Sequence, residues 1–540
     1  MTRQKEEWAT RLGVIMAVAG SAVGLGNFLR FPGQASQNGG GVFMIPYFCA
    51  LIFLGIPICW AEWAMGKYGG QCGFNSSPAI FGVLGRKPIW RYLGVVGVLV
   101  PVCVYFYYIV IESWCLGYAW CYLTGRINLG DDPTKYVEAS KAFYAGYVGS
   151  GADGVLLGLN ITMVFLVITF AVNFYVIYRG LSKGIETFCN WAIPVMAVFA
   201  LIVLVRVLTL DTPRAEFPEQ NVLNGLGFMW NPKPKHVGES WLAVLANPGV
   251  WLAAAGQIFF TLSVGFGVII NYASYLKRND DVVLSGLTAS ATNEFFEVCL
   301  GGLITIPAAF IFLGAIGIQD SLGSSFDLGF KTLPVVFEYM PAGRLFGFLW
   351  FFMLFLAAIT SSLSMLQPAI AFLEEGLNIG RHASCALLGI VTGTGTLFVV
   401  FFSKGLTALD TIDFWVGTAM LFVLATFEVI LFSWVFGADR GIAFARIGAE
   451  LPLPRLFRFV IRYVSPAYLV IVFAMWCYKN LPDYYRQLRL GGVPLFSILV
   501  IGVSFLFLLI LTGIAGKRWK AETKDTSALD KAIRQAGFVR

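Results

Sequence analysis

Charged residues, histidine and paired cysteines are all scarce in this sequence. Asp, Glu, Lys and Arg make up 13% of its 540 residues, whereas soluble domains usually carry about a quarter, so the composition argues against a water-soluble enzyme. The two histidines, His236 and His382, are far apart, which argues against a histidine-based site. The ten cysteines form no CxxC pair and lie mostly within apolar runs. We therefore expect no disulfide framework and no cysteine or histidine metal site.

Long hydrophobic runs are abundant. The residues are 58% hydrophobic, and the mean hydropathy is +0.74. A helix needs about 20 apolar residues to cross a bilayer, and the runs are too long for the ~10-residue strands of a membrane barrel. The sequence therefore predicts an all-α integral membrane protein with twelve transmembrane helices. The twelve runs cover residues 12–29, 31–61, 92–111, 155–178, 187–205, 240–276, 298–319, 345–373, 383–403, 414–427, 463–478 and 490–516.

The distribution of charge predicts the orientation in the membrane. Cytoplasmic loops carry an excess of Lys and Arg, and the basic clusters here fall on the side of both chain ends. We expect a multi-pass protein of the cell membrane, the inner membrane in a bacterium, with both termini cytoplasmic. The net charge of +7 needs no nucleic acid partner to explain it. The basic clusters lie at 86–91, 277–278, 440–462 and 517–520, and the predicted outer loops hold Asp131, Asp132, Asp153, Asp211, Glu216 and Glu219.

The runs divide into two halves of five spans each, residues 11–209 and 241–437. An odd number of spans gives the halves opposite orientations, so we predict a 5+5 inverted repeat. Both halves begin with an interrupted span, which reads GSAVGLGN from Gly20 and GQIFFTLSVGFG from Gly256. Matched breaks in corresponding spans are the best sequence indication of a transporter's central site. The remaining segments are a cytoplasmic start (1–10), an outer loop (210–240), helices 11 and 12 (438–516) and a basic cytoplasmic tail (517–540).

Broken helices are costly inside a bilayer, so the two breaks predict a function. Irregular backbone persists there only where it lines a cavity or binds something, and each glycine costs about 1 kcal/mol of helix stability relative to alanine. Freed carbonyls can coordinate a cation and helix N-termini favour an anion, which suits a zwitterion with sodium. Close packing at the Gly20-xxx-Gly24 spacing is an alternative. A dinucleotide site is weaker, because no strand precedes the glycines.

Five contiguous motifs indicate a family. They are WATR (8–11), GLGNFLRFP (24–32), NGGG (38–41), IESW (111–114) and GQIFFTLS (256–263). From about Lys5 to Gly516, the sequence closely resembles the neurotransmitter:sodium symporters, and among them the bacterial leucine-transporting branch. The resemblance implies sodium-coupled transport of a small amino acid by alternating access between the two sides of the bilayer.

The resemblance implies two sodium sites built from neutral oxygens. The first is completed by the carboxylate of the substrate, which couples ion and substrate directly, and the second is not. An alternative stays open for Thr360 and Ser361, whose hydroxyls could simply bond to carbonyls of their own helix. The implied first site comprises Ala22, Asn27, Thr261 and Asn293, and the second comprises Gly20, Val23, Ala357, Thr360 and Ser361.

The resemblance also implies an amino acid pocket between the breaks. The substrate carboxylate would meet the N–H groups of Leu25 and Gly26 and the Tyr108 hydroxyl. The substrate amine would meet backbone carbonyls near Ala22 and the Ser263 hydroxyl. The full implied set is Ala22, Leu25, Gly26, Val104, Tyr108, Phe260, Thr261, Ser263, Phe266, Ser361 and Met365.

Three positions bear on specificity. Gly24 stands where monoamine transporters of the family carry Asp, so an α-amino acid is favoured over a monoamine. The implied pocket has no charged side chain, and burying an unpaired charge is costly. We therefore expect leucine-like, methionine-like and aromatic substrates. Met365 replaces an isoleucine and Ser21 an asparagine of the leucine-transporting branch, and because methionine is adaptable, we expect a range broader than leucine.

Charged and polar residues in the spans are expected to form gates. Arg30 follows Asn27 by three residues, so both lie near the same helix face. The resemblance pairs Arg30 with Asp413, beside Gln257, as an outer gate closing over Phe260. On the inner side it implies an ion pair between Lys5 and Glu375 in place of an Arg–Asp pair, without bidentate geometry. An alternative of similar weight is that Lys5 only adds to the basic inner face. The implied inner gate comprises Lys5, Trp8, Ser274, Tyr275 and Glu375.

Asn293 and Glu297 are four residues apart on one face of the seventh span. A carboxylate inside the membrane is a functional hypothesis by default. In chloride-dependent relatives a serine occupies this position and chloride supplies the negative charge. The resemblance therefore implies that Glu297, expected near Tyr47, Gln257 and Thr261, replaces chloride.

We thus expect a chloride-independent, sodium-coupled symporter of hydrophobic L-amino acids rather than an enzyme. Its partners would be the amino acid, two sodium ions and the bilayer, with a homodimer possible in principle. A sodium-gated channel or sensor that uses the same site without concentrative uptake is the main alternative. An intramembrane enzyme is remote, because the sequence offers no nucleophile–base pair and no metal set.

Overall fold

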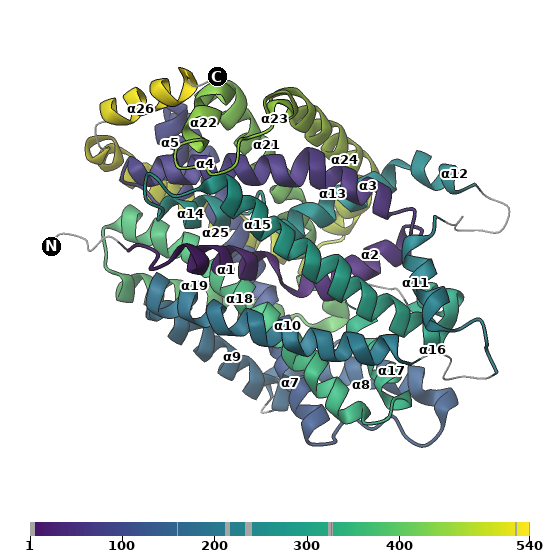
Figure 1. The fold of residues 1–540 in the computed structure, drawn as a ribbon. Coiled ribbons are helices and arrows are strands. Elements are labelled where there is room, and N and C mark those ends of the chain that lie inside the picture. The colour runs from purple at the N-terminus through teal and green to yellow at the C-terminus, as the bar shows by residue number, and fades with distance from the viewer. Residues whose placement is uncertain are drawn as a thin grey trace.

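The computed structural model describes residues 6–158, 160–210, 216–232, 240–321, 326, 328–523 and 526–538. Within these ranges the chain is almost entirely helical, and the β structure there is limited to one bridge between Gly40 and Pro232. The long helices lie roughly alongside one another (Figure 1). The start of α1 and the helices α22 and α26 lie at one end of the bundle, and α11, α12 and α17 lie at the other.

The first half of the chain contains α1 (Arg11–Ala22), α2 (Phe31–Gln37), α3 (Met44–Ala50), α4 (Ile56–Gln71), α5 (Ser77–Gly85), α6 (Pro88–Leu93), α7 (Val96–Leu123), α8 (Tyr136–Val148), α9 (Ile161–Tyr178), α10 (Thr187–Leu208), α11 (Val222–Trp230), α12 (Trp241–Ala246) and α13 (Pro248–Leu262). The second half contains α14 (Val268–Ser274), α15 (Val282–Glu294), α16 (Leu303–Ser321), α17 (Leu333–Tyr339), α18 (Gly343–Leu377), α19 (Arg381–Phe401), α20 (Thr407–Ile412), α21 (Leu421–Ile430), α22 (Ala438–Ala445), α23 (Arg455–Phe459), α24 (Ser465–Arg489), α25 (Val493–Glu522) and α26 (Ser527–Phe538). Turns of π-helix join several neighbours, such as α15 and α16, into longer rods.

Ten continuous helical rods of the described chain are long and apolar enough to cross a membrane, and the bent pair Arg11–Ala22 and Gly26–Gln37 makes an eleventh. The all-helical, multi-pass class predicted from the sequence is therefore confirmed. The predicted run 240–276 contains the short α12 and then two further pieces, α13 with 15 residues and α14 with 7. The count of twelve spans depends on whether this pair crosses as one.

The boundary between the first two predicted runs was wrong. The sequence placed a run from Phe31 onward, but the first bent rod continues to Gln37 and the second rod begins at Met44. Arg30 did not end the helix, because its guanidinium lies over an aromatic ring instead of in water. The chain turns after Gln37 through Gly39 and Gly40, which have φ values of +95° and +59°.

The first break separates α1 from the π-helical turn that begins at Gly26. Thr10 caps the start of α1 by accepting a hydrogen bond from the Gly13 N–H. The helix ends at Ala22, and the backbone of the next residue, Val23, is extended (φ −76°, ψ 96°). The two pieces of this span are bent by 45° relative to each other. The break therefore lies within the helix, where intrahelical partners for the backbone are lost.

The second break separates α13 from α14. Ser263, Gly265 and Gly267 all have positive φ, at +54°, +69° and +77°. Left-handed backbone costs little for glycine but is strained for other residues, so the glycines permit this turn. The Ser263 hydroxyl donates to the Ser21 carbonyl at 3.1 Å. The two breaks thus face each other, and each supplies polar partners to the other.

The centre of the bundle is formed by α7 and α18. The most apolar stretch of the rod Pro88–Leu123, which contains α7, is wholly buried, whereas only 28% of the corresponding stretch of α25 is buried. Large apolar side chains on α25, such as Val503 and Ile514, are exposed. The outer helices therefore present apolar surface to lipid, while α7 and α18 line the space beside the breaks.

The positive φ of Gly267 gives a test of the second break. A Cβ at Gly267 would collide with the backbone of Gly97. We expect Gly267→Ala to lower the free energy of unfolding by about 1–3 kcal/mol through backbone strain, measured as a lower thermal unfolding midpoint in detergent. Gly256→Ala is the matched control, because that helical position has no atom within 4 Å of the added Cβ. Equal midpoints for the two variants would contradict the strained geometry.

Candidate ion and substrate site

A small cavity lies between the two breaks. Every residue predicted for the substrate pocket lines it except Leu25 and Val104. The Leu25 N–H donates to the Tyr108 hydroxyl at 3.3 Å, and Val104 is fully buried. The lining residues are Ser21, Ala22, Gly24, Gly26, Tyr108, Phe260, Thr261, Ser263, Phe266, Ser361 and Met365, none of which carries a charge.

Gly24 has little room for a side chain. A Cβ at this position would lie 2.5 Å from the Ser361 hydroxyl and 2.9 Å from that of Tyr108. The Gly24 N–H donates to the Asn27 side-chain oxygen at 2.8 Å, which holds the break against the next turn. The absence of a side chain at Gly24 is therefore what keeps this wall of the cavity open.

The residues predicted for the first sodium site converge at one side of the cavity. One end of the Asn293 amide lies 3.1 Å from the Ala22 carbonyl oxygen and 3.3 Å from that of Thr261. The same end lies 2.7 Å from the Asn27 amide nitrogen. With nitrogen at this end, the amide donates to both carbonyls. With oxygen there, three oxygens face one another, a set that a hard cation would satisfy.

Glu297 lies directly behind this group. It is fully buried on the π-helical turn Phe295–Gly302, which follows α15. A buried carboxylate must be hydrogen-bonded or paired, and here the donors come from the π-helical turn after the first break, from α13 and from α15. Glu297 accepts from Gln257 at 2.9 Å, Asn27 at 3.2 Å and Asn293 at 3.4 Å, and it also bonds to the Thr261 hydroxyl.

A second acid in the same place was missed by the sequence reasoning. Glu294, one turn before Glu297, accepts a hydrogen bond from the Tyr47 hydroxyl at 2.8 Å. Tyr47 was expected near Glu297 and does lie within interacting distance of that carboxylate, while its hydroxyl donates to the neighbouring Glu294. The spacing of Glu294 and Glu297 is visible in the sequence, but the helix face that each occupies is set by the local π-helical turn.

The residues predicted for the second sodium site lie between α1 and α18. The Ser361 hydroxyl is 3.3 Å from the Gly20 carbonyl oxygen and 3.2 Å from that of Ala357, so it links the two helices. The Thr360 hydroxyl donates to carbonyls of its own preceding turn, at 3.0 and 3.1 Å. Bonding to carbonyls of the same helix, the alternative left open from the sequence, therefore accounts for the Thr360 hydroxyl. It accounts only partly for the Ser361 hydroxyl, which also bonds to the Gly20 carbonyl of α1. Val23 brings its extended backbone to the same end of α1.

The predicted outer ion pair between Arg30 and Asp413 does not form in this structure. The Arg30 guanidinium lies 4.5 Å from the centre of the Phe260 ring, and its Nη1 is buried without a hydrogen-bond partner among the described residues. Asp413 accepts from the Tyr107 hydroxyl at 2.6 Å. The ring face attracts the cation and the phenol satisfies the acid, so each charge has a local partner. Gln257 was expected beside this pair, but its side-chain amide donates to Glu297.

The inner side of the cavity is closed by buried aromatic groups. The Trp8 ring N–H donates to the Tyr272 carbonyl at 3.0 Å, and both rings pack edge to face. Ser274 and Tyr275 are buried beside them, and Tyr275 accepts a hydrogen bond from Gln367 at 3.0 Å. The outer rim, by contrast, is half-buried at Arg30 and Phe260. The residues on the Trp8 side of the cavity are therefore more fully buried than Arg30 and Phe260 on the opposite side.

Of the predicted inner ion pair between Lys5 and Glu375, the structure describes only Glu375. Lys5 lies outside the described residues. Glu375 accepts from the Asn75 N–H at 2.6 Å and from the N–H and hydroxyl of Ser76. Within the described N-terminal segment, Glu6 forms an ion pair with Arg381 at 2.9 Å.

Comparison with known proteins agrees with this geometry. The profile of the Sodium:neurotransmitter symporter family matches residues 5–140 and 130–515. An uncharacterized sodium-dependent transporter of Methanocaldococcus jannaschii is 29% identical over 94% of this chain and 97% of its own length. The sodium-dependent nutrient amino acid transporter 1 of Drosophila melanogaster is 27% identical over 92% of this chain and 82% of its own.

A solved structure has a similar fold. The crystal structure of MhsT in complex with L-phenylalanine superposes with a TM-score of 0.73, at 25% sequence identity, and covers 87% of this chain and 99% of that one. The relatives are transporters rather than enzymes, and the profile spans nearly the whole chain. The chain is therefore a multi-pass, sodium-dependent membrane transporter that belongs to the sodium:neurotransmitter symporter family.

Proposed function

We propose that this protein is a sodium-coupled symporter of hydrophobic L-amino acids that works by alternating access and does not need chloride. The observation that carries the proposal is the cavity between two opposed helix breaks, lined by aromatic side chains and neutral oxygens. Substrates with leucine-like, methionine and aromatic side chains fit a lining without charge. The complex of MhsT with L-phenylalanine supports the same substrate class.

The substrate would lie with its two charged groups against the breaks. The Leu25 N–H and the Tyr108 hydroxyl are within hydrogen-bonding distance of each other, and both would turn to the carboxylate. Backbone oxygens near Ala22 and the Ser263 hydroxyl would receive the amine. Phe260, Phe266 and Met365 would surround the side chain, with Val104 behind them.

Two sodium ions would accompany each substrate. The first would be held by Ala22, Asn27, Thr261 and Asn293 together with the substrate carboxylate, so that ion and substrate bind as a unit. The second would lie between Gly20, Val23, Ala357, Thr360 and Ser361, where it would join the broken α1 to α18. Neutral oxygens suit an ion that must later leave. In this scheme Glu297 supplies the fixed negative charge that makes chloride unnecessary.

The architecture that fits this function has twelve spans. We infer that α13 and α14 cross the membrane together as the sixth span, matching the broken first span. Residues 11–209 and 241–437 would then form inverted halves, and spans 1, 2, 6 and 7 would rock against the others. An even number of spans places both termini on the same side of the membrane, which fits the position of α1 and α26 at the same end of the bundle (Figure 1). The basic clusters would make that side the cytoplasm.

The number of sodium ions moved with each substrate sets the largest concentration ratio that the transporter can maintain, so it can be measured. Each sodium ion that moves inward down 100 mV yields about 2.3 kcal/mol, and a tenfold gradient adds roughly 1.4 kcal/mol per ion. Two ions would support about 7 kcal/mol, or roughly 10⁵-fold accumulation of a net-neutral substrate. One ion would support only several hundredfold.

Uphill uptake is the first test. In proteoliposomes with an imposed sodium gradient, we expect labelled L-leucine to accumulate above its outside concentration, and collapse of the gradient to release it. A channel or sensor would give no uphill accumulation, and this result would refute symport. Competition by the other common amino acids, with and without sodium, would rank the substrates.

Chloride dependence tests the role of Glu297. We expect wild-type uptake to be unchanged when chloride is replaced by gluconate. Glu297→Ser should lower uptake several-fold in gluconate and recover it with chloride, because the bound anion would replace the lost carboxylate. Glu294→Gln is the matched control, since it removes the neighbouring acid and should create no chloride dependence. An active Glu297→Ser variant that ignores chloride would count against the proposal.

Gly24 tests the substrate pocket. Overpacking costs about 1–3 kcal/mol, so Gly24→Ala should weaken sodium-dependent binding of labelled L-leucine by about 5- to 150-fold. The added methyl would press against the Ser361 and Tyr108 hydroxyls. Gly256→Ala, which meets open space, should keep the wild-type affinity. Unchanged binding by Gly24→Ala would exclude this wall from the substrate site.

A further inference from the structure

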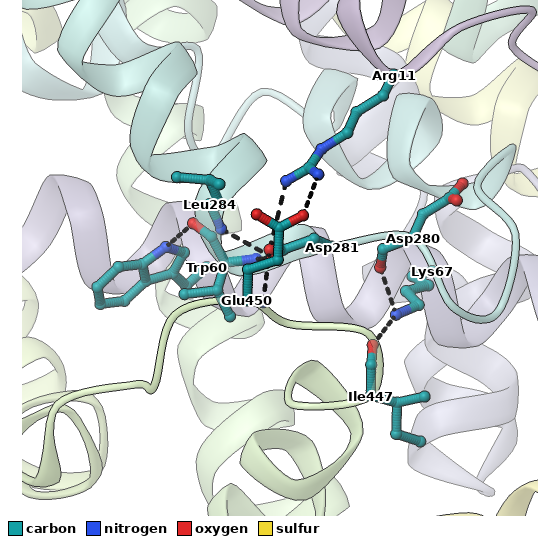
Figure 2. Close-up of polar contacts among 9 residues, drawn as sticks. Arg11, Trp60, Lys67, Asp280, Asp281, Leu284, Ile447 and Glu450 are labelled. Atoms are coloured by element: carbon teal, nitrogen blue, oxygen red, sulfur yellow. Dashed lines mark hydrogen bonds and ion pairs between the residues drawn. The ribbon is translucent and has the colours of Figure 1, made fainter.

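The loop between α22 and α23 lies against several membrane elements at the end of the bundle where α1 begins. Figure 2 shows Ile447 and Glu450 of this loop beside Arg11 of α1, Lys67 of α4 and the residues that precede α15. We call residues 446–450 the inner loop. Neither the inner loop nor its contacts were anticipated from the sequence, where they read only as part of a basic cytoplasmic segment.

Lys67 makes the first buried connection to the inner loop. Its side chain is fully buried near the inner end of α4. Its Nζ donates to the carbonyl oxygens of Asp280 and Ile447, both at 2.8 Å, and lies 5.3 Å from the ring centre of Phe444. In the described part of the chain no ion pair to Lys67 is formed, and the two carbonyls and the ring are the direct contacts of its ammonium group.

Asp281 makes the second connection. One of its carboxylate oxygens caps α15 by accepting from the Val283 and Leu284 N–H groups at 2.8 and 2.9 Å. The other oxygen accepts from the Glu450 backbone N–H at 2.9 Å and lies 3.4 Å from Arg11. Asp281 thus divides its two oxygens between the helix that it starts and the inner loop.

The contacts of this cluster differ in strength. The ion pair between Arg11 and Glu450 is 2.6 Å long, but the two side chains are 43% and 60% exposed, and exposed pairs contribute little. Asp281 is 2% exposed, and hydrogen bonds to buried charged groups contribute more and are costly to leave unmade. The bonds of Lys67 to Ile447 and of Glu450 to Asp281 therefore dominate.

These two bonds cross the boundary that the proposed rocking motion defines. Lys67 and Asp281 belong to the moving spans 2 and 7, whereas the inner loop joins spans 10 and 11 of the static part. The bonds of Lys67 to Asp280 and of Arg11 to Asp281 lie within the moving part and can persist. Opening toward the inner side therefore has to break the connections to the inner loop.

We propose that the inner loop is a latch that holds the transporter closed on its inner side, with Lys67 and Asp281 as the positioning residues. This inference rests on the proposed alternating access. The latch contacts the moving spans directly, and its residues are separate from the aromatic cluster around Trp8. Weakening it should shift the resting protein toward the inward-open state without touching the substrate cavity.

Cys189 provides a native reporter of that state. It is fully buried on α10, in the static part, and its sulfur lies 3.3 Å from where a Cβ on Gly20 of α1 would be. Movement of α1 away from α10 would uncover this thiol. Its rate of modification by N-ethylmaleimide, read from the Cys189 peptide by mass spectrometry, then measures inner opening while the other cysteines are ignored.

The decisive variant is Asp281→Asn. Asparagine caps helices well, so its side-chain oxygen can keep the cap while its NH₂ group faces the Glu450 N–H as a second donor. We expect Cys189 modification in the full-length, sodium-free protein to become about tenfold faster. Lys67→Met, which removes the other connection at similar volume, should act in the same direction and decides the matter if Asp281→Asn does not fold. Asp439→Asn is the control, because its exposed pair with Arg458 lies outside the latch.

The outcomes separate the latch from the proposed function. Faster modification in both folded latch variants, with the control unchanged, would support the latch. Wild-type rates in a folded latch variant would overturn it, even if the wild-type protein accumulates leucine in proteoliposomes. Failure of the wild-type protein to accumulate any hydrophobic amino acid would instead refute symport, whatever the modification rates.

Discussion

The structure depends on the requirement that backbone polar groups inside a bilayer find partners within the protein. Two spans violate regular helical bonding at Val23–Leu25 and at Ser263–Gly267. An isolated break of this kind would be very unfavourable in lipid. The two breaks lie opposite each other and exchange hydrogen bonds through Ser263. These bonds offset part of the free-energy cost of the unpaired backbone groups, and a polar ligand bound between the breaks can offset the rest.

Buried acids follow the same constraint. Glu297 lies where four neutral donors converge, and a carboxylate without them would be expelled from such a site. Glu62 accepts from the Gly265 N–H at 2.6 Å, which supports the second break from behind. Glu112 accepts from Asn173 at 2.8 Å in another part of the bundle. Acids in the membrane therefore serve as hydrogen-bond partners both for irregular backbone and for polar side chains beside the cavity.

Much of this arrangement was predictable from the sequence, and the physical reasons for the exceptions differ. The breaks could be located because clustered glycines weaken a membrane helix at a known point of the chain, whereas most of the cavity lining was implied by the resemblance to the symporter family. The end of the first span could not be located, because a charged residue such as Arg30 usually marks the end of a membrane helix. Only the tertiary structure shows that its guanidinium lies over the Phe260 ring. The outer pair of Arg30 and Asp413 failed because each charge found a nearer partner.

The inner loop was not predictable for a different reason. Its two main bonds use a backbone N–H and a backbone carbonyl, which carry no residue-specific signal. Only the buried lysine at position 67 is unusual in the sequence, and its partners are distant along the chain. Polar contacts made by main-chain atoms of a loop become visible only when the tertiary structure is known.

The C-terminal helix has a practical consequence for handling the protein. The family profile ends at residue 515, but α26 packs on α22, with Leu529 and Ile533 buried and Asp530 paired with Arg440. Truncation after the last membrane helix would uncover apolar surface on α22 and leave that arginine without its acid. Affinity tags and fluorescent fusions are therefore better attached through a spacer after α26 than in its place.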